Sequence, residues 1–314
     1  MRYKIEGVIK KMHIILLLLL LFALMFAAAF IGVAQSSDFV IVHLRIPRII
    51  MSVFAGAALT LCGAVFQSIF RNPVCDPYIL GISSGASIGA ALAFILGLDF
   101  YLFGVTAFAL LTAFLTLLLM LGITQFSKLK SSYIMLLAGI SLNFLMAALL
   151  TLLIVLNHQE MQKIIFWTMG SFATISYYDL QFFIPIFTIC TFFIFLLSKD
   201  LNIMQLGDAQ AQSLGVNTQK VTYLTLILSS ILIATAVSIC GVIGFIGLII
   251  PHLARIIWGN NTKRLFACSM LLGAIFMLIA DTLARTMISN AELPVGSITA
   301  LIGAPYFIYM LIRH

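Results

Sequence analysis

Long apolar runs separated by short polar interruptions form the dominant pattern of this chain. A membrane-spanning helix needs roughly 20 apolar residues, and most of the runs have about that length. They predict spans at residues 13–33, 48–69, 78–97, 103–125, 133–156, 179–198, 219–240, 243–258, 264–287 and 297–312. An even number of spans places both chain ends on the same side of the membrane.

The first apolar run has some features of a secretory signal. Four basic residues precede it, and the sequence GVAQSS follows its apolar part. The run is longer than the apolar core of a signal peptide, which has about 7–15 residues. We therefore interpret residues 13–33 as a retained first span.

Three segments interrupt the regular pattern. Residues 160–173 contain an apolar stretch too short to cross, which predicts a half-helix or surface helix on the outer side. Residues 241–255 carry three glycines and Pro251, which predict close helix contact and a break or kink at the proline. Two X-Pro pairs within residues 72–77 predict another break. Broken helices in both halves of a membrane protein indicate a transport pathway.

A polar interlude at residues 201–221 separates two of the long runs. Asp208 is a suitable N-cap and Gly215 a suitable C′ residue, so the pattern predicts one short helix at residues 209–214. Asn217 or Thr218 then offers a cap for the next span. Such a helix on the membrane surface could transmit force, and an ordinary loop is the alternative.

Composition agrees with the pattern. The 314 residues are 63% hydrophobic and only 9% charged, and the mean hydropathy is +1.18. This composition is typical of an all-α integral membrane protein. The predicted spans leave no room for a soluble domain, so we expect one membrane domain over residues 1–314.

The basic residues predict the orientation of the chain. When the spans are threaded alternately, thirteen of the seventeen basic residues fall on one side. Basic loops face the cytoplasm, so both termini and the polar interlude are expected there. The four exceptions are Arg45, Arg48, Lys163 and Arg285.

The sequence offers little for catalysis. It contains no phosphate-binding GxxxxGK[ST] loop, so ATP hydrolysis is expected only on a separate partner. The five cysteines and five histidines are scattered and form no CxxC pair. We therefore predict no catalytic residue, no metal site and no cofactor, and a membrane-embedded enzyme lacks the clustered histidines and acids it would need.

Asp281 is the one acid well inside a predicted span. Intramembrane acids are costly and are often functional, so an ion-coupled secondary transporter that uses Asp281 is one hypothesis. A single carboxylate makes a poor proton relay, however. Structural hydrogen bonding is the interpretation we favour for Asp281, because buried polar groups usually find a partner.

Arg45 and Arg48 are spaced i, i+3, and Arg285 lies near the same predicted membrane face. At the start of a helix, positive charge opposes the macrodipole, and an anionic visitor would offset that cost. Three solvated or headgroup-binding arginines are the alternative.

Four segments together resemble the FecCD-type permeases of ABC importers, which take up iron-siderophores, haem and cobalamin. These segments are RIPRIIMSVFAGAALTLCGAVFQSIFRNPVCDPYILGISSGASIGA (45–90), LGDAQAQSLGV (206–216), GVIGFIGLIIPHLAR (241–255) and ADTLARTMISNAELPVGSITALIGAPYFIYML (280–311). They cover about half of the chain, in the order and spacing of the family. Cys75 and Lys220 depart from its usual residues.

The resemblance implies a type II ABC importer permease: a homodimer of ten-span subunits with a pathway on the dimer axis and two ATPase subunits. The coupling helix region would be about 201–218. Its residues seated in the ATPase would be Leu206, Gly207, Asp208, Ala211, Leu214 and Gly215. Arg45, Arg48 and Arg285 would meet carboxylates of a substrate-binding protein. Asn72, Ser131 and Ser132 would form a cytoplasmic gate.

The expected function is therefore that of the permease subunit through which an iron chelate, siderophore or haem, crosses the bacterial inner membrane. A cobalamin permease of the same architecture and the ion-coupled transporter are the alternatives. Lipid is the expected surroundings, and nucleic acid is not an expected partner. A heterodimer with a related permease stays open.

Overall fold

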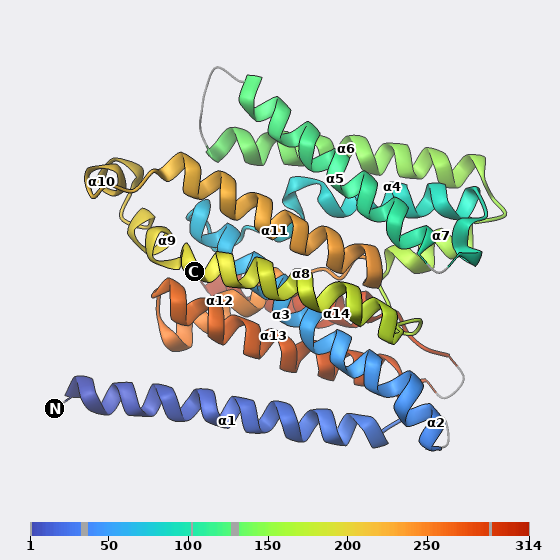
Figure 1. Cartoon of the computed structure of the whole chain (residues 1–314), viewed down its shortest axis with the longest axis horizontal. Helices are drawn as coiled ribbons and strands as arrows, with labels where there is room; N and C mark the ends of the chain where they lie inside the picture. The colour runs from blue at the N-terminus through green and yellow to red at the C-terminus, as the bar shows by residue number, and fades with distance from the viewer. Residues whose placement is uncertain (1, 33–36, 102, 127–131, 289–290, 314) are drawn as a thin grey trace.

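The computed structural model describes residues 2–32, 37–101, 103–126, 132–288 and 291–313. A helix lies at each of the ten predicted spans, and Figure 1 shows these helices side by side. They are α1 (Arg2–Phe30), α3 (Ile46–Ile69), α4 (Ile82–Ile95), α5 (Gly104–Phe126), α6 (Ser132–Leu156), α8 (Tyr177–Leu196), α11 (Thr218–Cys240), α12 (Ile246–Trp258), α13 (Thr262–Ala284) and α14 (Val295–Arg313).

Short helical elements connect the spans. The predicted half-helix at residues 160–173 is confirmed as α7, and the interlude holds two short helices instead of one. The connecting elements are α2 (Asp38–Val40), the π-helix η1 (Ile41–Arg45), the 3-10 helices η2 (Pro77–Leu80) and η3 (Leu98–Phe100), α7 (Met161–Thr168), α9 (Ser198–Met204) and α10 (Asp208–Ser213).

Seven helices of the described chain are long and apolar enough to cross a membrane alone, whereas α4, α12 and α14 have shorter apolar stretches. The 14 residues of α4 make a helix about 21 Å long, against roughly 30 Å of hydrocarbon. The predicted spans 78–97 and 243–258 were therefore too long at their starts. Left-handed residues before the two helices explain this: Gly81 has φ +78°, and Phe245 has φ +67°.

Helices α3, α11 and α13 form the centre of the bundle. The most apolar window of the helix ending at Ile69 is 83% buried and that of α11 is 72% buried, against 11% for α1 and 17% for α6. Small residues permit this close packing. A Cβ on Gly63 of α3 would lie 1.8 Å from the carbonyl oxygen of Gly247 in α12. The peripheral helices α1 and α6 leave most of their apolar surface for lipid or another subunit.

The two broken segments contact each other. After α3 the chain turns at Arg71, a non-glycine residue with φ +49°, and returns along the bundle to η2. There the Tyr78 hydroxyl donates to the carbonyl of Ile243 over 2.8 Å and accepts from its amide over 3.2 Å. The second break thus lies at residues 241–245. The expectation of a break at Pro251 was wrong, because α12 continues through that residue; the alternative of a kink there stays a prediction.

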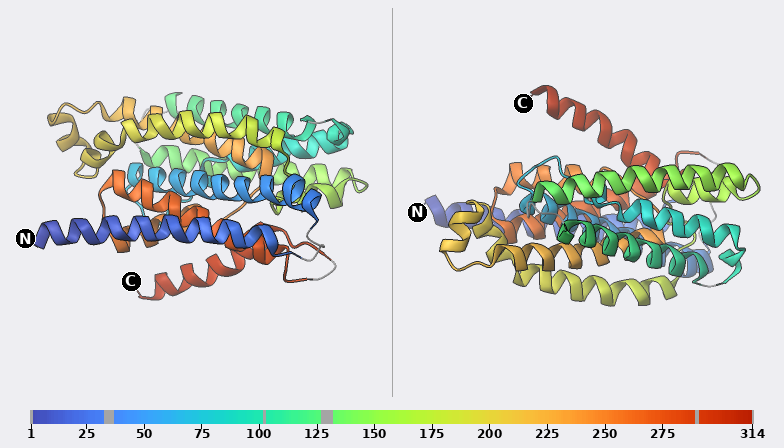
Figure 2. Two further views of the ribbon diagram at one scale, coloured as in Figure 1. Left: turned by 60° about the horizontal axis from the view of Figure 1, so that its bottom comes forward. Right: turned by 90° about the horizontal axis from the view of Figure 1, so that it is seen from above.

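The two ends of the bundle differ in what they carry. Helix α10, the start of α1 and the end of α14 all lie toward one end, here called the α10 end (Figure 1). Helices α2 and α7 lie at the opposite end, which we call the arginine end because Arg45, Arg48 and Arg285 lie there. Figure 2 shows α14 diverging from the other helices as it approaches the α10 end.

Candidate functional site

A buried ion pair joins α3 to α13 at the arginine end. Arg48 Nε donates to Asp281 Oδ1 at 2.9 Å and to Oδ2 at 3.1 Å, and its Nη2 lies 2.9 Å from Oδ1. The Asp281 side chain is fully buried, and that of Arg48 is 9% exposed. Each charge therefore has the partner that a low-dielectric interior demands. Asp281, isolated in the sequence, has its favoured hydrogen-bonding partner in space.

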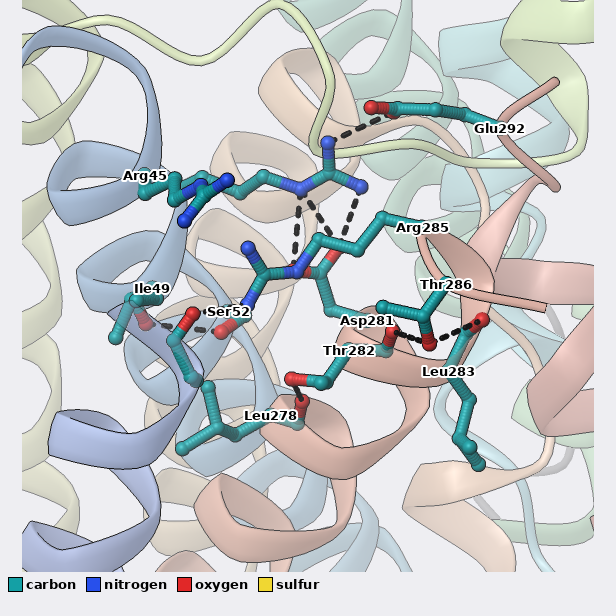
Figure 3. Close-up of polar contacts among 12 residues, drawn as sticks. Arg45, Ile49, Ser52, Leu278, Asp281, Thr282, Leu283, Arg285, Thr286 and Glu292 are labelled. Carbon is teal, nitrogen blue, oxygen red and sulfur yellow. Dashed lines mark hydrogen bonds and ion pairs between the residues drawn. The ribbon is translucent and has the colours of Figure 1, made fainter. Parts of the chain in front are cut away.

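A second carboxylate approaches Arg48 from a different direction. Glu292, on the connection between α13 and α14, accepts from Arg48 Nη1 at 2.7 Å. Its side chain is 50% exposed. Figure 3 shows Glu292 and Asp281 on different sides of the guanidinium group that both contact. Glu292 was not among the predicted site residues; its position seven residues after Arg285 was the available signal.

Arg45 and Arg285 bind the end of α1. Arg45 Nη1 donates to the carbonyl of Ala29 at 2.9 Å, and Arg285 Nη2 donates to that of Ala28 at 2.6 Å. Both carbonyls lie in the last turn of α1, where a helix leaves its acceptors without intrahelical partners and favours cations. The two arginines therefore serve as a C-terminal cap that fixes α1 to the bundle.

The three arginines form one cluster, as expected, but they are largely buried. Arg45, Arg48 and Arg285 are 5%, 7% and 6% exposed. The alternative of solvated arginines is therefore wrong for the described cluster. The helical rod also begins at Asp38 and passes through the π-helix η1, so Arg45 and Arg48 do not lie in the first turn. The expected conflict with the macrodipole was wrong for that reason.

Lys163, the fourth basic exception, has a local explanation. Its Nζ lies 2.9 Å from Asp99 Oδ2 and 2.9 Å from Glu160 Oε2. Hydrogen bonds to Asp99 and Glu160 raise the pKa of Lys163 above its usual value. The pair with Asp99 joins α7 to η3 at the arginine end, whereas the pair with Glu160 is local to the start of α7.

At the other end of the bundle, α10 is a short and well-capped helix. The amide of Val216 donates to Ala211 at 3.0 Å and that of Gly215 to Gln212 at 2.9 Å, which is the Schellman pattern. Gly215, with φ +84°, is the predicted C′ residue. The N-cap is Gly207 instead of Asp208, because the helix includes Asp208 as its first residue. Asn217 caps α11 by accepting from the Lys220 amide at 3.0 Å.

The residues predicted to couple α10 to a partner differ in how far they are buried. Ala211 is fully buried, whereas Leu206 and Leu214 on either side of the helix are 65% and 62% exposed. Asp208 pairs with Arg71, the residue that turns the chain after α3. Helix α10 thus presents two exposed leucines while an ion pair connects it to the first broken segment.

A cavity of about 700 Å³ lies beside this ion pair. Its walls come from α10, the first turns of α11, the start of α6 and the ends of α3, α5 and α9. Its lining includes Arg71, Thr124, Asp208, Gln212 and Tyr223. Most of the residues that line the cavity have polar side chains. The contact between Asp208 and Arg71 therefore spans the edge of a polar space at the α10 end.

The predicted gate residues are only partly described. Asn72 is exposed, and its Oδ1 accepts from the Val74 amide at 3.0 Å, so it stabilises the turn after α3. Ser131 lies outside the described residues, and Ser132 begins α6. Asn143, in the middle of α6, was not predicted as a site residue. It donates to the Tyr78 carbonyl at 2.9 Å and accepts from Ser84.

The part of the chain that the structure describes contains no group of three or more His, Cys, Asp or Glu residues that could hold a metal ion. The five cysteines are free and buried. Cys62 Sγ donates to the Ser229 carbonyl at 3.5 Å, so it serves in packing between α3 and α11.

Comparison with known proteins shows which family this chain resembles. The model of the FecCD transport family matches residues 13–313. The molybdate import system permease protein MolB of Haemophilus influenzae is 41% identical over 85% of this chain and 79% of its own. The hemin transport system permease protein HmuU of Yersinia pestis is 38% identical over 87% of this chain and 83% of its own.

The solved structures agree with the sequence comparison. A chain described as an inward-facing conformation of an ABC transporter assigned to the metal-chelate type superposes with a TM-score of 0.89. It is 38% identical, and the match covers 97% of this chain and all of that one. With this fold, this extent of identity and the family match over nearly its whole length, the chain belongs to the FecCD transport family.

Proposed function

We propose that the chain is the permease subunit of an ABC importer that carries an iron chelate across the bacterial inner membrane. The observation that carries the proposal is α10, a rigidly capped helix with two exposed leucines at one end of a membrane bundle. Such a helix suits insertion into a cleft of a separate ATPase. The sequence lacks a nucleotide-binding loop of its own.

The contacts around α10 support a route for coupling. Movement of α10 would act on Arg71 through Asp208. Arg71 begins the broken segment that reaches Tyr78, and Tyr78 is bound to Ile243 in the second break and to Asn143 in α6. A partner ATPase could therefore bias the positions of both broken segments and α6 by moving one short helix.

We assign a second copy of this chain as the membrane partner. Helix α6 has an apolar window that is only 17% buried, and its sequence includes Ser141 and Thr151, which are exposed. Polar groups facing away from the bundle favour a pathway shared with another subunit over contact with lipid alone. Two copies would then bind two ATPase subunits, one at each α10.

The bundle supports the proposed orientation. Helix α10 and the two chain ends share one end of the molecule (Figures 1 and 2), and most basic residues thread to that side. The α10 end is therefore assigned to the cytoplasm, and the arginine end to the side from which a binding protein delivers cargo.

Docking of that binding protein is assigned to the arginine end. Arg45, Arg48 and Arg285 form a cationic cluster there, and the half-exposed carboxylate of Glu292 contacts Arg48. Acidic residues of a binding protein would complement the cluster. Ion coupling through Asp281 is less favoured, because both of its carboxylate oxygens accept hydrogen bonds from Arg48.

The cargo is proposed as chelated iron, although relatives of similar identity carry names for molybdate and hemin. The test uses the chain co-purified with its candidate ATPase and reconstituted in liposomes with a candidate binding protein. ATP-dependent uptake is measured for a ferric siderophore, hemin, cobalamin and molybdate. ATP-dependent uptake of the siderophore or hemin, stimulated by the binding protein, is the expected result.

Two other results would reject parts of the proposal. Uptake by the chain alone, without ATP or ATPase, would indicate an ion-coupled transporter. ATP-dependent uptake of molybdate or cobalamin only would keep the importer but reject iron as cargo. Arg45→Gln, which removes the bond to Ala29 and leaves the Arg48–Asp281 pair intact, should weaken stimulation by the binding protein.

A further inference from the structure

The two carboxylates that contact Arg48 differ in how easily they can leave. Asp281 is fully buried and binds the Nε and Nη2 side of the guanidinium. Glu292 binds only Nη1, and half of its side chain is exposed. The guanidinium therefore has one inner partner and one outer partner.

Burial decides which partner can exchange. Moving Asp281 away would leave an uncompensated charge in the interior, which is strongly unfavourable. Glu292 would regain water as it leaves, and an ion pair with an exposed partner contributes little net stability. The Asp281 contact is therefore permanent, while the Glu292 contact can be replaced by another carboxylate.

We propose that Glu292 occupies a carboxylate-binding position that an acidic side chain of the docking protein takes over. This inference rests on the proposed docking of a binding protein at the arginine end. Three arginines face two carboxylates in the cluster, so a single departing carboxylate leaves a strongly cationic site. Glu292 keeps that site filled until a competing carboxylate displaces it.

Exchange of one carboxylate for another has a measurable signature. In the wild-type chain, docking breaks one ion pair with Arg48 and forms another, so this contact adds little dependence on salt. In Glu292→Gln no intramolecular ion pair has to break. Docking of the variant should therefore be tighter and more sensitive to ionic strength, and association should be faster because one repelling charge is gone.

The experiment compares three chains, each co-purified with the ATPase and placed in lipid nanodiscs. Binding of the candidate binding protein is measured at low and high salt for wild type, Glu292→Gln and Glu160→Gln. Glu160 is the matched control, since it also forms an ion pair at the arginine end, with Lys163. We expect the Kd to fall about two- to fivefold for Glu292→Gln, and to stay unchanged for Glu160→Gln.

The outcomes separate this inference from the proposed function. A wild-type complex that does not bind the protein rejects docking at this end altogether. Normal wild-type binding with an equal or higher Kd for Glu292→Gln rejects the exchange and leaves docking intact. Glu292→Ala provides a second variant: it should also bind more tightly, and its salt dependence should likewise exceed that of wild type.

Discussion

The Arg48 guanidinium illustrates how much one side chain can connect in this protein. It joins α3 to α13 through Asp281 and to the following connection through Glu292. Because Asp281 is fully buried, the pair is favourable only while both charges remain. The arginine that was expected to meet a binding protein is thus also part of the internal structure, and substitutions there affect both.

The first prediction concerns that pair. Arg48→Gln and Asp281→Asn should each lower the free energy of unfolding by up to about 3–5 kcal/mol, since each removes the main partner of a buried charge. Asp281 would keep only the 4.0 Å contact with Arg285, and Arg48 only the half-exposed Glu292. The double variant should lose clearly less than the sum of the two. Apparent thermal midpoints in detergent, analysed as a double-mutant cycle, measure this coupling. Glu160→Gln should change stability by less than about 0.5 kcal/mol, and additive losses would contradict the buried pair.

At the scale of whole helices, the fold depends on how helices end and on how closely they pack. Left-handed residues end or start α4, α10 and α12, and close backbone approach fixes α3 against its neighbours. Glycine supplies the left-handed residue at α4 and α10, whereas Phe245 supplies it at α12. These features explain why short helices such as α10 hold a defined shape although six residues are too few for stability in isolation.

The α10 cap provides the second prediction. Gly215 has φ +84°, which costs a residue with a Cβ about 1–2 kcal/mol. Gly215→Ala should therefore speed hydrogen exchange of the Gly215 and Val216 amide positions by about fivefold or more, because their bonds to Gln212 and Ala211 weaken. Gly215→Asn should have a smaller effect, since Asn tolerates this conformation. Equal protection in all three chains would contradict the Schellman cap.

The contact between α3 and α12 provides the third prediction. A Cβ at Gly63 would overlap the Gly247 carbonyl, so Gly63→Ala must push the two helices apart. We expect a loss of about 1–3 kcal/mol, measured as a lower thermal midpoint. Gly122 in α5 is the matched control, because a Cβ there has nothing within 4 Å. A Gly63→Ala chain as stable as Gly122→Ala would show that the helices do not approach this closely.

The whole bundle is a rod with two chemically different ends. One carries α10 and both chain ends, and the other carries the arginine cluster and α7 (Figure 1). If the protein crosses the membrane as proposed, these ends face opposite compartments. The proposed coupling and docking surfaces are then separated by the full thickness of the bilayer, so the helices between them must carry the signal.

The fourth prediction tests this orientation. The five natural cysteines are buried, so a membrane-impermeant thiol reagent should label them weakly. Gln162→Cys in α7 and Ser213→Cys in α10 introduce thiols at exposed positions. We expect Gln162→Cys to react in intact cells and Ser213→Cys to react only after the membrane is opened. The reverse pattern would invert the assigned orientation, and labelling of both in intact cells would contradict a full crossing.

The presence and order of the ten helices and the C-terminal cap of α10 could be predicted from sequence, because they depend on local features: apolar run length, and a glycine or asparagine at a helix boundary. The approximate cluster of Arg45, Arg48 and Arg285 also followed from helix spacing and span order. Resemblance to the family added the expected role of α10. Apolar run length and capping residues act over a few residues or one span, and span order follows from counting the spans. These signals can therefore be read from a linear sequence.

Other features depended on contacts between residues far apart in the chain. Arg48 and Asp281 are 233 positions apart, so neither charge reveals its partner, its burial or the outer position left to Glu292. The start of α12 was misplaced because the run at residues 243–258 is apolar whether or not its backbone is helical. The bond between Tyr78 and Ile243 is equally invisible in sequence. Tertiary packing decides these features, because burial and pairing depend on which helix faces overlap.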